Sequence, residues 1–131
     1  MAQLVIALLF LGHGIGHFLF LANSWGYWKG AVGRASFFEN VLHATQSVES
    51  MVGILWLIPL VGFLGAAWGF YNVTPWWRTV ALASALLSAV LIVVWWSGLT
   101  SSSAFFALVF DVAVVAILLY QQSTGIVSST P

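Results

Sequence analysis

The chain has 131 residues, of which 62% are hydrophobic and only 5% are charged, and its mean hydropathy is +1.06. A soluble domain carries about 25% charged residues, so this composition excludes a soluble globular protein and indicates an integral membrane protein. The net charge of zero argues against a nucleic-acid partner. The absence of cysteine excludes disulfides, thiolate metal sites and iron–sulfur clusters.

Four segments are long and apolar enough to cross a bilayer as helices, which takes about 20 residues each. They cover residues 2–22, 51–71, 76–97 and 104–122. Because the links between the last three are short, we predict one all-α domain that forms an up-down transmembrane four-helix bundle. The first segment lacks a basic region before its apolar stretch, and we interpret it as a retained span rather than a signal peptide.

The first span contains the sequence GHGIGH, which holds two of the chain's three histidines. His13 and His17 are four residues apart, so they project from one face of a helix, one turn apart. Gly12 and Gly16 lie beside them and remove side chains from the neighbouring face. These glycines allow either close packing of another helix or space for a ligand, and the sequence leaves both alternatives open.

The link over residues 23–50 begins with an aromatic and basic stretch, WGYWKGAVGR, that is typical of a membrane interface. Ser36 and Glu39 then form a predicted capping box, which indicates a short amphipathic helix over residues 37–47. This helix is expected at the membrane surface or as an extension of the second span. Glu39 and His43 are spaced to share one face of it, near the end of the bundle towards which His17 points.

The second and third spans carry small residues at helical spacing, which allow close helix packing in lipid. These are Gly62, Gly65 and Gly69 in the second span, and Ala81, Ser84, Ala85, Ser88 and Ala89 in the third. Pro59 lies inside the second span with apolar residues on both sides, so it is expected to kink the helix rather than to end it.

The fourth span contains Asp111, the only acidic residue within the four predicted spans. With a rise of about 1.5 Å per residue, Asp111 falls at a depth between those of His13 and His17. The first and fourth spans are expected to be adjacent in an up-down bundle. We therefore predict a His–Asp pair, or a protonated Asp111 that donates a hydrogen bond.

Several kinds of chemistry suit these side chains. If the short helix folds over the bundle, His43 and Glu39 could join His13, His17 and Asp111 as ligands for Zn²⁺ or non-haem iron. Haem ligation by two histidines requires imidazoles from opposite helices, which two residues of one helix cannot supply. The same residues could instead form a purely structural hydrogen-bond network, or contact a partner subunit.

The segments LLFLGHGIGHFLF, VGILWLIPLVGFLGAAWGF, TPWWRTVALASALLSAVL and FDVAVVAILL resemble a group of small, uncharacterised bacterial four-span proteins. In that group an HGxxH-type stretch recurs in the first span and a GxLWL stretch in the second. The architecture is also similar to DoxX-like membrane proteins. This resemblance implies, at most, an accessory role in a redox complex that uses quinone or haem.

The leading functional hypothesis is a multi-pass membrane protein with a buried His13/His17/Asp111 site for a metal ion, a proton or a small polar ligand. The rival hypothesis is a noncatalytic accessory or assembly subunit, packed in a homo-oligomer or a larger membrane complex. Whether the protein is an enzyme stays open. The expected location is a prokaryotic inner membrane, and two basic residues against one slightly favour a cytoplasmic 23–50 link.

Overall fold

The computed structural model describes residues 1–27, 36–99 and 101–124, and the described chain is helical apart from short connections. The α-helices are α1 (Ala2–Ser24), α2 (Gln46–Gly53), α3 (Leu57–Tyr71), α4 (Trp77–Trp95) and α5 (Ser101–Ser123). Three short irregular helices complete the fold: the π-helix η1 (Phe37–Val41) and the 3₁₀ turns η2 (Ile54–Trp56) and η3 (Trp96–Gly98).

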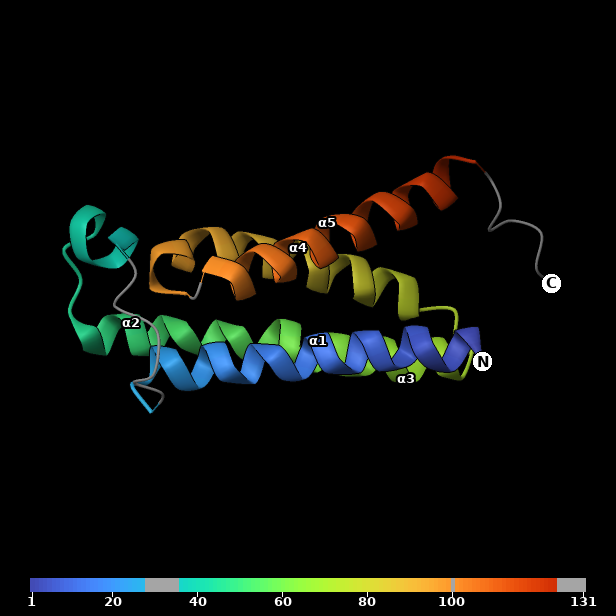
Figure 1. Cartoon of the computed structure of the whole chain (residues 1–131), viewed down its shortest axis with the longest axis horizontal. Helices are drawn as coiled ribbons and strands as arrows, with labels where there is room; N and C mark the ends of the chain where they lie inside the picture. Colours follow the sequence, from blue (N-terminus) through green and yellow to red (C-terminus); the bar gives the residue numbers. More distant parts are fainter. Residues whose placement is uncertain (28–35, 100, 125–131) are drawn as a thin grey trace.

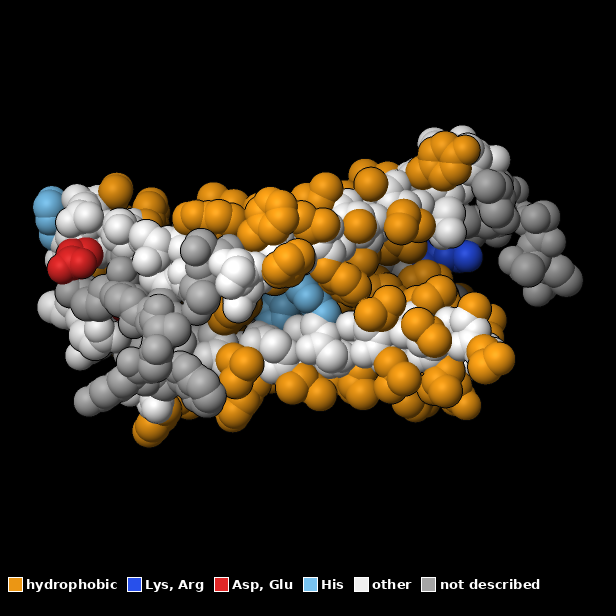
Figure 2. Space-filling model, viewed as in Figure 1, with side chains coloured by type: hydrophobic (Ala, Val, Ile, Leu, Met, Phe, Trp, Pro, Cys, Tyr) orange, Lys and Arg blue, Asp and Glu red, His pale blue; other side chains and the backbone are white. Residues whose placement is uncertain are grey.

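Four continuous helical stretches are long and apolar enough to cross a membrane: Ala2–Ser24, Gln46–Tyr71, Trp77–Gly98 and Ser102–Ser123. The second of these joins α2, η2 and α3 end to end. The stretches alternate in direction, so α1 starts and α5 ends at the same end of the bundle (Figure 1). Large apolar side chains cover the outer surface of the helices (Figure 2). The predicted all-α, up-down, four-helix membrane bundle is confirmed.

The second span begins five residues earlier than predicted, at Gln46 rather than at residue 51. A short helix does precede it, but η1 ends at Val41 instead of residue 47. The backbone of His43 has a φ of 49°, which interrupts the helical path between η1 and α2. The earlier start of the span places Glu49 inside a helix, where it is buried.

The predicted capping box at the start of η1 is wrong. Ser36 has helical dihedral angles, and its side chain makes no capping hydrogen bond. Its backbone N–H instead donates to the Ser97 hydroxyl at 2.6 Å, which ties the start of η1 to η3, the turn that follows α4. This tertiary hydrogen bond replaces the local capping hydrogen bonds that were predicted between Ser36 and Glu39.

Pro59 lies within α3 and does not end the helix, as predicted. The helical geometry changes one turn earlier, at η2, which is a 3₁₀ turn. A proline ring lacks an N–H and crowds the carbonyl of the residue four positions before it, which here is Leu55. The turn therefore tightens where the proline removes the regular hydrogen bond.

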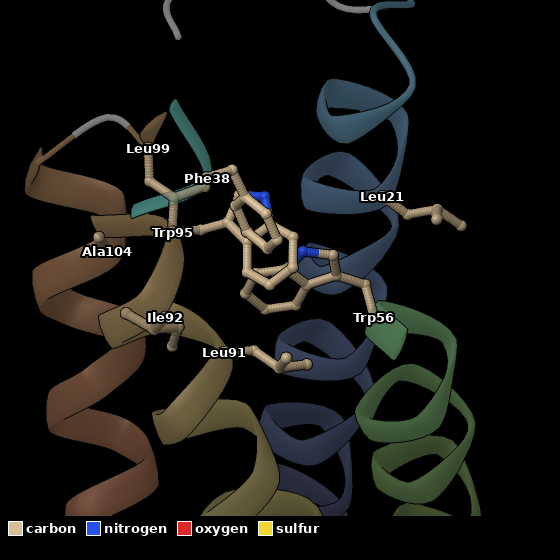
Figure 3. Packing of buried hydrophobic residues seen from close by; sticks show 8 residues of the cluster. All are labelled: Leu21, Phe38, Trp56, Leu91, Ile92, Trp95, Leu99 and Ala104. Carbon is tan, nitrogen blue, oxygen red and sulfur yellow. The ribbon is translucent and has the colours of Figure 1, made fainter. Parts of the chain in front are cut away.

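The spans pack in the order α1, α3, α4, α5, with extensive contacts between each consecutive pair. Two buried apolar clusters fill the interior. The cluster near the α2 end contains Leu21, Phe38, Trp56, Leu91, Ile92, Trp95, Leu99 and Ala104. Figure 3 shows its aromatic rings from η1, η2 and α4 meeting between the helices. The other cluster contains Phe10, Phe63, Ala66, Ala67, Ala81, Ala85, Val114 and Leu118.

Glycines permit the close approach of neighbouring helices at particular points. A Cβ on Gly14 would lie 3.1 Å from Cβ of Phe63 and 3.2 Å from the Leu60 carbonyl oxygen, so α1 and α3 meet there. A Cβ on Gly62 would collide with a side chain in the middle of α4. A Cβ on Gly69 would collide with side chains at the start of α4 and in the turn before it. Gly65 is less crowded, with its nearest neighbour at 4.0 Å. Close packing is thus confirmed most clearly for Gly62 and Gly69.

Candidate functional site

Three helices place four polar side chains together in the middle of the bundle. His13 and His17 come from α1, Ser88 from α4 and Asp111 from α5. The side chain of Asp111 is fully buried and that of His13 is 10% exposed. His17 and Ser88 are also buried. The predicted meeting of the first-span histidines with Asp111 is confirmed.

Hydrogen bonds join these four residues in a closed ring, which we call the polar ring. Nε2 of His13 lies 2.8 Å from Oδ1 of Asp111. The other oxygen, Oδ2, lies 2.5 Å from Oγ of Ser88, and that Oγ lies 2.7 Å from Nε2 of His17. Nδ1 of His17 lies 2.8 Å from the His13 backbone carbonyl oxygen and closes the ring.

Aromatic side chains surround the polar ring, and two of them, Trp56 and Phe63, belong to the two apolar clusters. The His13 imidazole stacks on Phe110 of α5 at a centroid distance of 4.3 Å and meets the edge of Phe63 at 4.7 Å. His17 lies between Phe63 and Trp56, at 5.6 Å from each. These contacts fix the orientation of both imidazoles.

The proton positions in the polar ring follow from the hydrogen-bond partners. A carbonyl oxygen only accepts, so Nδ1 of His17 donates to His13. The three remaining links need one proton each. If Nε2 of His13 donates to Asp111, the link between these two residues has its proton. The Ser88 hydroxyl supplies the proton of a second link, either to Asp111 or to His17. The third proton belongs either to Asp111, as a neutral acid, or to His17, as an imidazolium.

Both arrangements contain the same number of protons and give the polar ring a net charge of zero. In the first, Asp111 donates to Ser88, which donates to His17. In the second, His17 donates to Ser88, which donates to Asp111. Moving from one to the other shifts two protons along the ring without changing its total charge. Neutrality suits the middle of a membrane, where an isolated charge is costly.

A hollow of about 490 Å³ opens beside the polar ring, between α1 and α5. Its walls include His13, His17, Phe106 and Phe110. Figure 2 shows histidine side chains at the base of this hollow, on an otherwise apolar face. The two helices that border the hollow are not an extensively packed pair; side chains, chiefly His13, Asp111 and Phe110, connect them.

Gly12 and Gly16 line the hollow, and a Cβ on either would meet no atom within 4 Å in the described part of the chain. Of the two alternatives that the sequence left open, close helix packing at these two glycines has no support among the described residues. Their other interpretation, as residues that leave space beside the imidazoles, agrees with the structure. The close approach of α1 to α3 occurs at Gly14 instead, on another face of the helix.

Glu39 and His43 do not join the polar ring. Both are exposed at the α2 end of the molecule. Figure 2 shows acidic and histidine side chains at that end, apart from the histidine atoms at its centre. Within the described ranges, no group of three or more histidine or carboxylate side chains is arranged to hold a metal ion. In the polar ring itself, only Nδ1 of His13 is left without a hydrogen-bond partner among the described residues.

Sequence reasoning missed two polar residues. Ser88 was assigned only to helix packing, although its position near the centre of the third span gives it a depth similar to that of Asp111. Matching the depth of every polar residue across the spans would have found it. Glu49 was assigned to the link, because the start of the second span was placed too late.

No family model matches this chain, and no curated protein or solved structure matches it. The similarity to DoxX-like proteins therefore stays a prediction.

Proposed function

We propose that this membrane protein binds a proton or the polar group of a small ligand at His13, within the bilayer. The observation that carries the proposal is the polar ring, in which every hydrogen-bonding atom except Nδ1 of His13 has a partner inside the ring. His13 also lines the hollow, and Nδ1 is not one of the fully buried unpartnered polar atoms of the described chain. Nδ1 is thus the atom of the ring that a ligand can reach.

The other three residues act as positioning residues. If Asp111 accepts from Nε2 of a neutral His13, Nδ1 carries no proton. The hydrogen bond of one imidazole nitrogen sets the state of the other, as in many histidine sites. Ser88 and His17 complete the ring and provide a path along which its protons can shift.

A metal ion fits this arrangement less well than a proton or a polar ligand. Structural zinc sites use four protein ligands, and catalytic sites usually use three. Both oxygens of Asp111 and both nitrogens of His17 already take part in hydrogen bonds. A metal ion would have to displace several of these bonds to gain ligands beyond His13.

The rival proposal is a noncatalytic subunit of a larger complex, in which the polar ring only fixes the register of the helices. Interhelical hydrogen bonds contribute about 0.6 kcal/mol each on average, which suffices for such a role. A structural ring requires no accessible acceptor and no hollow. Residence in a prokaryotic inner membrane and kinship with DoxX-like proteins are further proposals, which rest on the sequence motifs.

Nitrogen-15 NMR of histidine side chains, in protein reconstituted into lipid nanodiscs, tests the proposal directly. The chain has three histidines, so His43→Gln and His17→Gln spectra assign all the resonances. We expect His13 to carry its proton on Nε2 and to present a bare Nδ1. Phenol, a small uncharged hydroxyl compound, should shift the Nδ1 resonance of His13 and leave that of His43 unchanged.

Asp111→Leu provides the matched control, because it removes the acceptor that holds the His13 tautomer. In that variant His13 should populate both tautomers. A His13 that carries its proton on Nδ1 in the wild-type protein, or that is insensitive to phenol, would contradict the proposal and favour the rival subunit.

A further inference from the structure

The hollow beside His13 continues along the seam between α1 and α5. A second cavity of about 250 Å³ lies on the other side of Phe110. Leu9 and Phe110 line both cavities, so the two spaces adjoin. The second cavity extends towards the chain termini and is walled by apolar residues such as Phe10, Trp77 and Ile117. The seam therefore combines a polar group at His13 with a long, mostly apolar wall, and the amide of Gln121 lines the second cavity, with its buried oxygen unpartnered in the described part of the chain.

The polar group at His13 requires a ligand that donates a hydrogen bond. When the polar ring is neutral and each of its links holds one proton, Nε2 of His13 carries the proton that it shares with Asp111, and Nδ1 is then an acceptor. A hydroxyl group can donate to it, whereas an ether, ester or ketone cannot. The aromatic faces of Phe106 and Phe110 and the bare backbone at Gly12 and Gly16 shape the space around this point.

The walls of the seam also disfavour a charged ligand. Among the described residues, no lysine, arginine, aspartate or glutamate lines either cavity, and the neutral polar ring contributes no net charge. A phosphate or carboxylate head would have to lose its hydration without gaining a counter-ion, which is costly at this depth. The seam instead offers an apolar surface to a hydrocarbon chain, and it opens between two helices that are long and apolar enough to span a membrane.

We infer that the ligand is an uncharged lipid with a hydroxyl head and a long hydrocarbon tail, which enters sideways from the bilayer between α1 and α5. Its hydroxyl donates to Nδ1 of His13, and its tail follows the seam past Phe110 into the second cavity. The inference rests on the proposed function of His13 and adds the class of ligand and its route of entry.

The experiment compares three probes with matched tails in nanodiscs: oleyl alcohol, its methyl ether and the alkene 1-octadecene. The readout is the Nδ1 resonance of His13 as each probe is added to the bilayer. We expect oleyl alcohol to shift this resonance, while the ether and the alkene leave it in place. Phenol, diacylglycerol and a prenyl alcohol are tested in the same way. Their shifts of the His13 resonance show whether the hydroxyl belongs to an aromatic, a glyceride or an isoprenoid compound.

Two variants test the route. Gly12→Leu and Gly16→Leu place a side chain in the hollow without meeting any described atom at Cβ, so the fold should be retained. Each should weaken the oleyl alcohol response by roughly tenfold. Ile15→Leu, on an exposed face of α1 outside both cavities, should leave the response unchanged.

The outcomes separate this inference from the proposed function. If phenol shifts the His13 resonance but oleyl alcohol does not, the lipid ligand is wrong while the polar site stands. If the ether shifts the His13 resonance as much as the alcohol does, the hydroxyl donor is wrong. If both glycine variants respond like the wild type, the route between α1 and α5 is wrong. If no hydroxyl compound shifts the resonance, the proposed function fails as well.

Discussion

His13 of α1 and Asp111 of α5 are joined by a 2.8 Å hydrogen bond across two helices whose backbones pack little against each other. Both lie near the middle of their spans, and the carboxylate is fully buried. The bond, together with the stacking of His13 on Phe110, therefore connects the two sides of the hollow. The stability of the bundle and its accessibility from lipid both depend on this pair.

Replacing Asp111 with alanine should destabilise the bundle, because the change removes the two hydrogen bonds that Asp111 makes with His13 and Ser88. We expect a loss of about 1–3 kcal/mol in the free energy of unfolding. Unfolding by sodium dodecyl sulfate in mixed micelles measures it. Val112→Ala, at an exposed position next in sequence, is the control. Equal stability of the two variants would show that the His13–Asp111 bond contributes nothing.

Alanine substitutions at Gly14 and Gly12 should change the stability of the protein differently, although the two residues are only two positions apart. Gly14→Ala would press a methyl group against the α3 backbone and should cost about 1–3 kcal/mol. Gly12→Ala meets only open space and should be neutral, or stabilising by up to about 1 kcal/mol, because alanine favours a helix. Thermal unfolding in detergent compares them. A larger loss for Gly12→Ala would show that another chain packs on the hollow.

Ser88→Ala should uncouple His17 from Asp111, since the hydroxyl is the link between them. The expected cost is about 0.5–1.5 kcal/mol, with a change in the Nε2 resonance of His17 in the nitrogen-15 spectrum. Ser84→Ala, one turn earlier on α4, removes a buried hydroxyl outside the ring. An unchanged His17 spectrum in Ser88→Ala would argue against the proton path.

Trp56 and Trp95 each bury an indole N–H that has no hydrogen-bond partner in the described part of the chain. Their rings meet at a centroid distance of 5.7 Å (Figure 3). Trp56→Phe removes the unsatisfied donor while retaining an aromatic ring, so it should cost less than about 1 kcal/mol. Trp56→Ala should cost about 3–5 kcal/mol, because it leaves a large cavity. Unfolding midpoints in detergent distinguish these values, and a similar loss for both would indicate that the indole nitrogen is needed.

The described residues contain four candidate spans, so the start of α1 and the end of α5 should lie on one side of the membrane. Reporter fusions at the two termini should therefore give the same topology signal. A fusion inserted within the 23–50 link should give the opposite one. The slight excess of basic residues in that link predicts that it faces the cytoplasm. Opposite signals at the two termini would mean that one helical stretch does not span.

The sequence by itself determined the fold class, because long apolar runs separated by short polar turns leave the chain few alternatives in lipid. It also determined that His13, His17 and Asp111 lie at similar depths, since helix rise converts position into depth. Depth carries no information about rotation around each helix axis. Only the tertiary structure decided that Ser88 completes the ring and that Gly14, rather than Gly12 or Gly16, packs against α3. It likewise decided that Glu39 and His43 stay apart from the ring, because contacts of η1 with η3 and the end of α4 override the local helix signals.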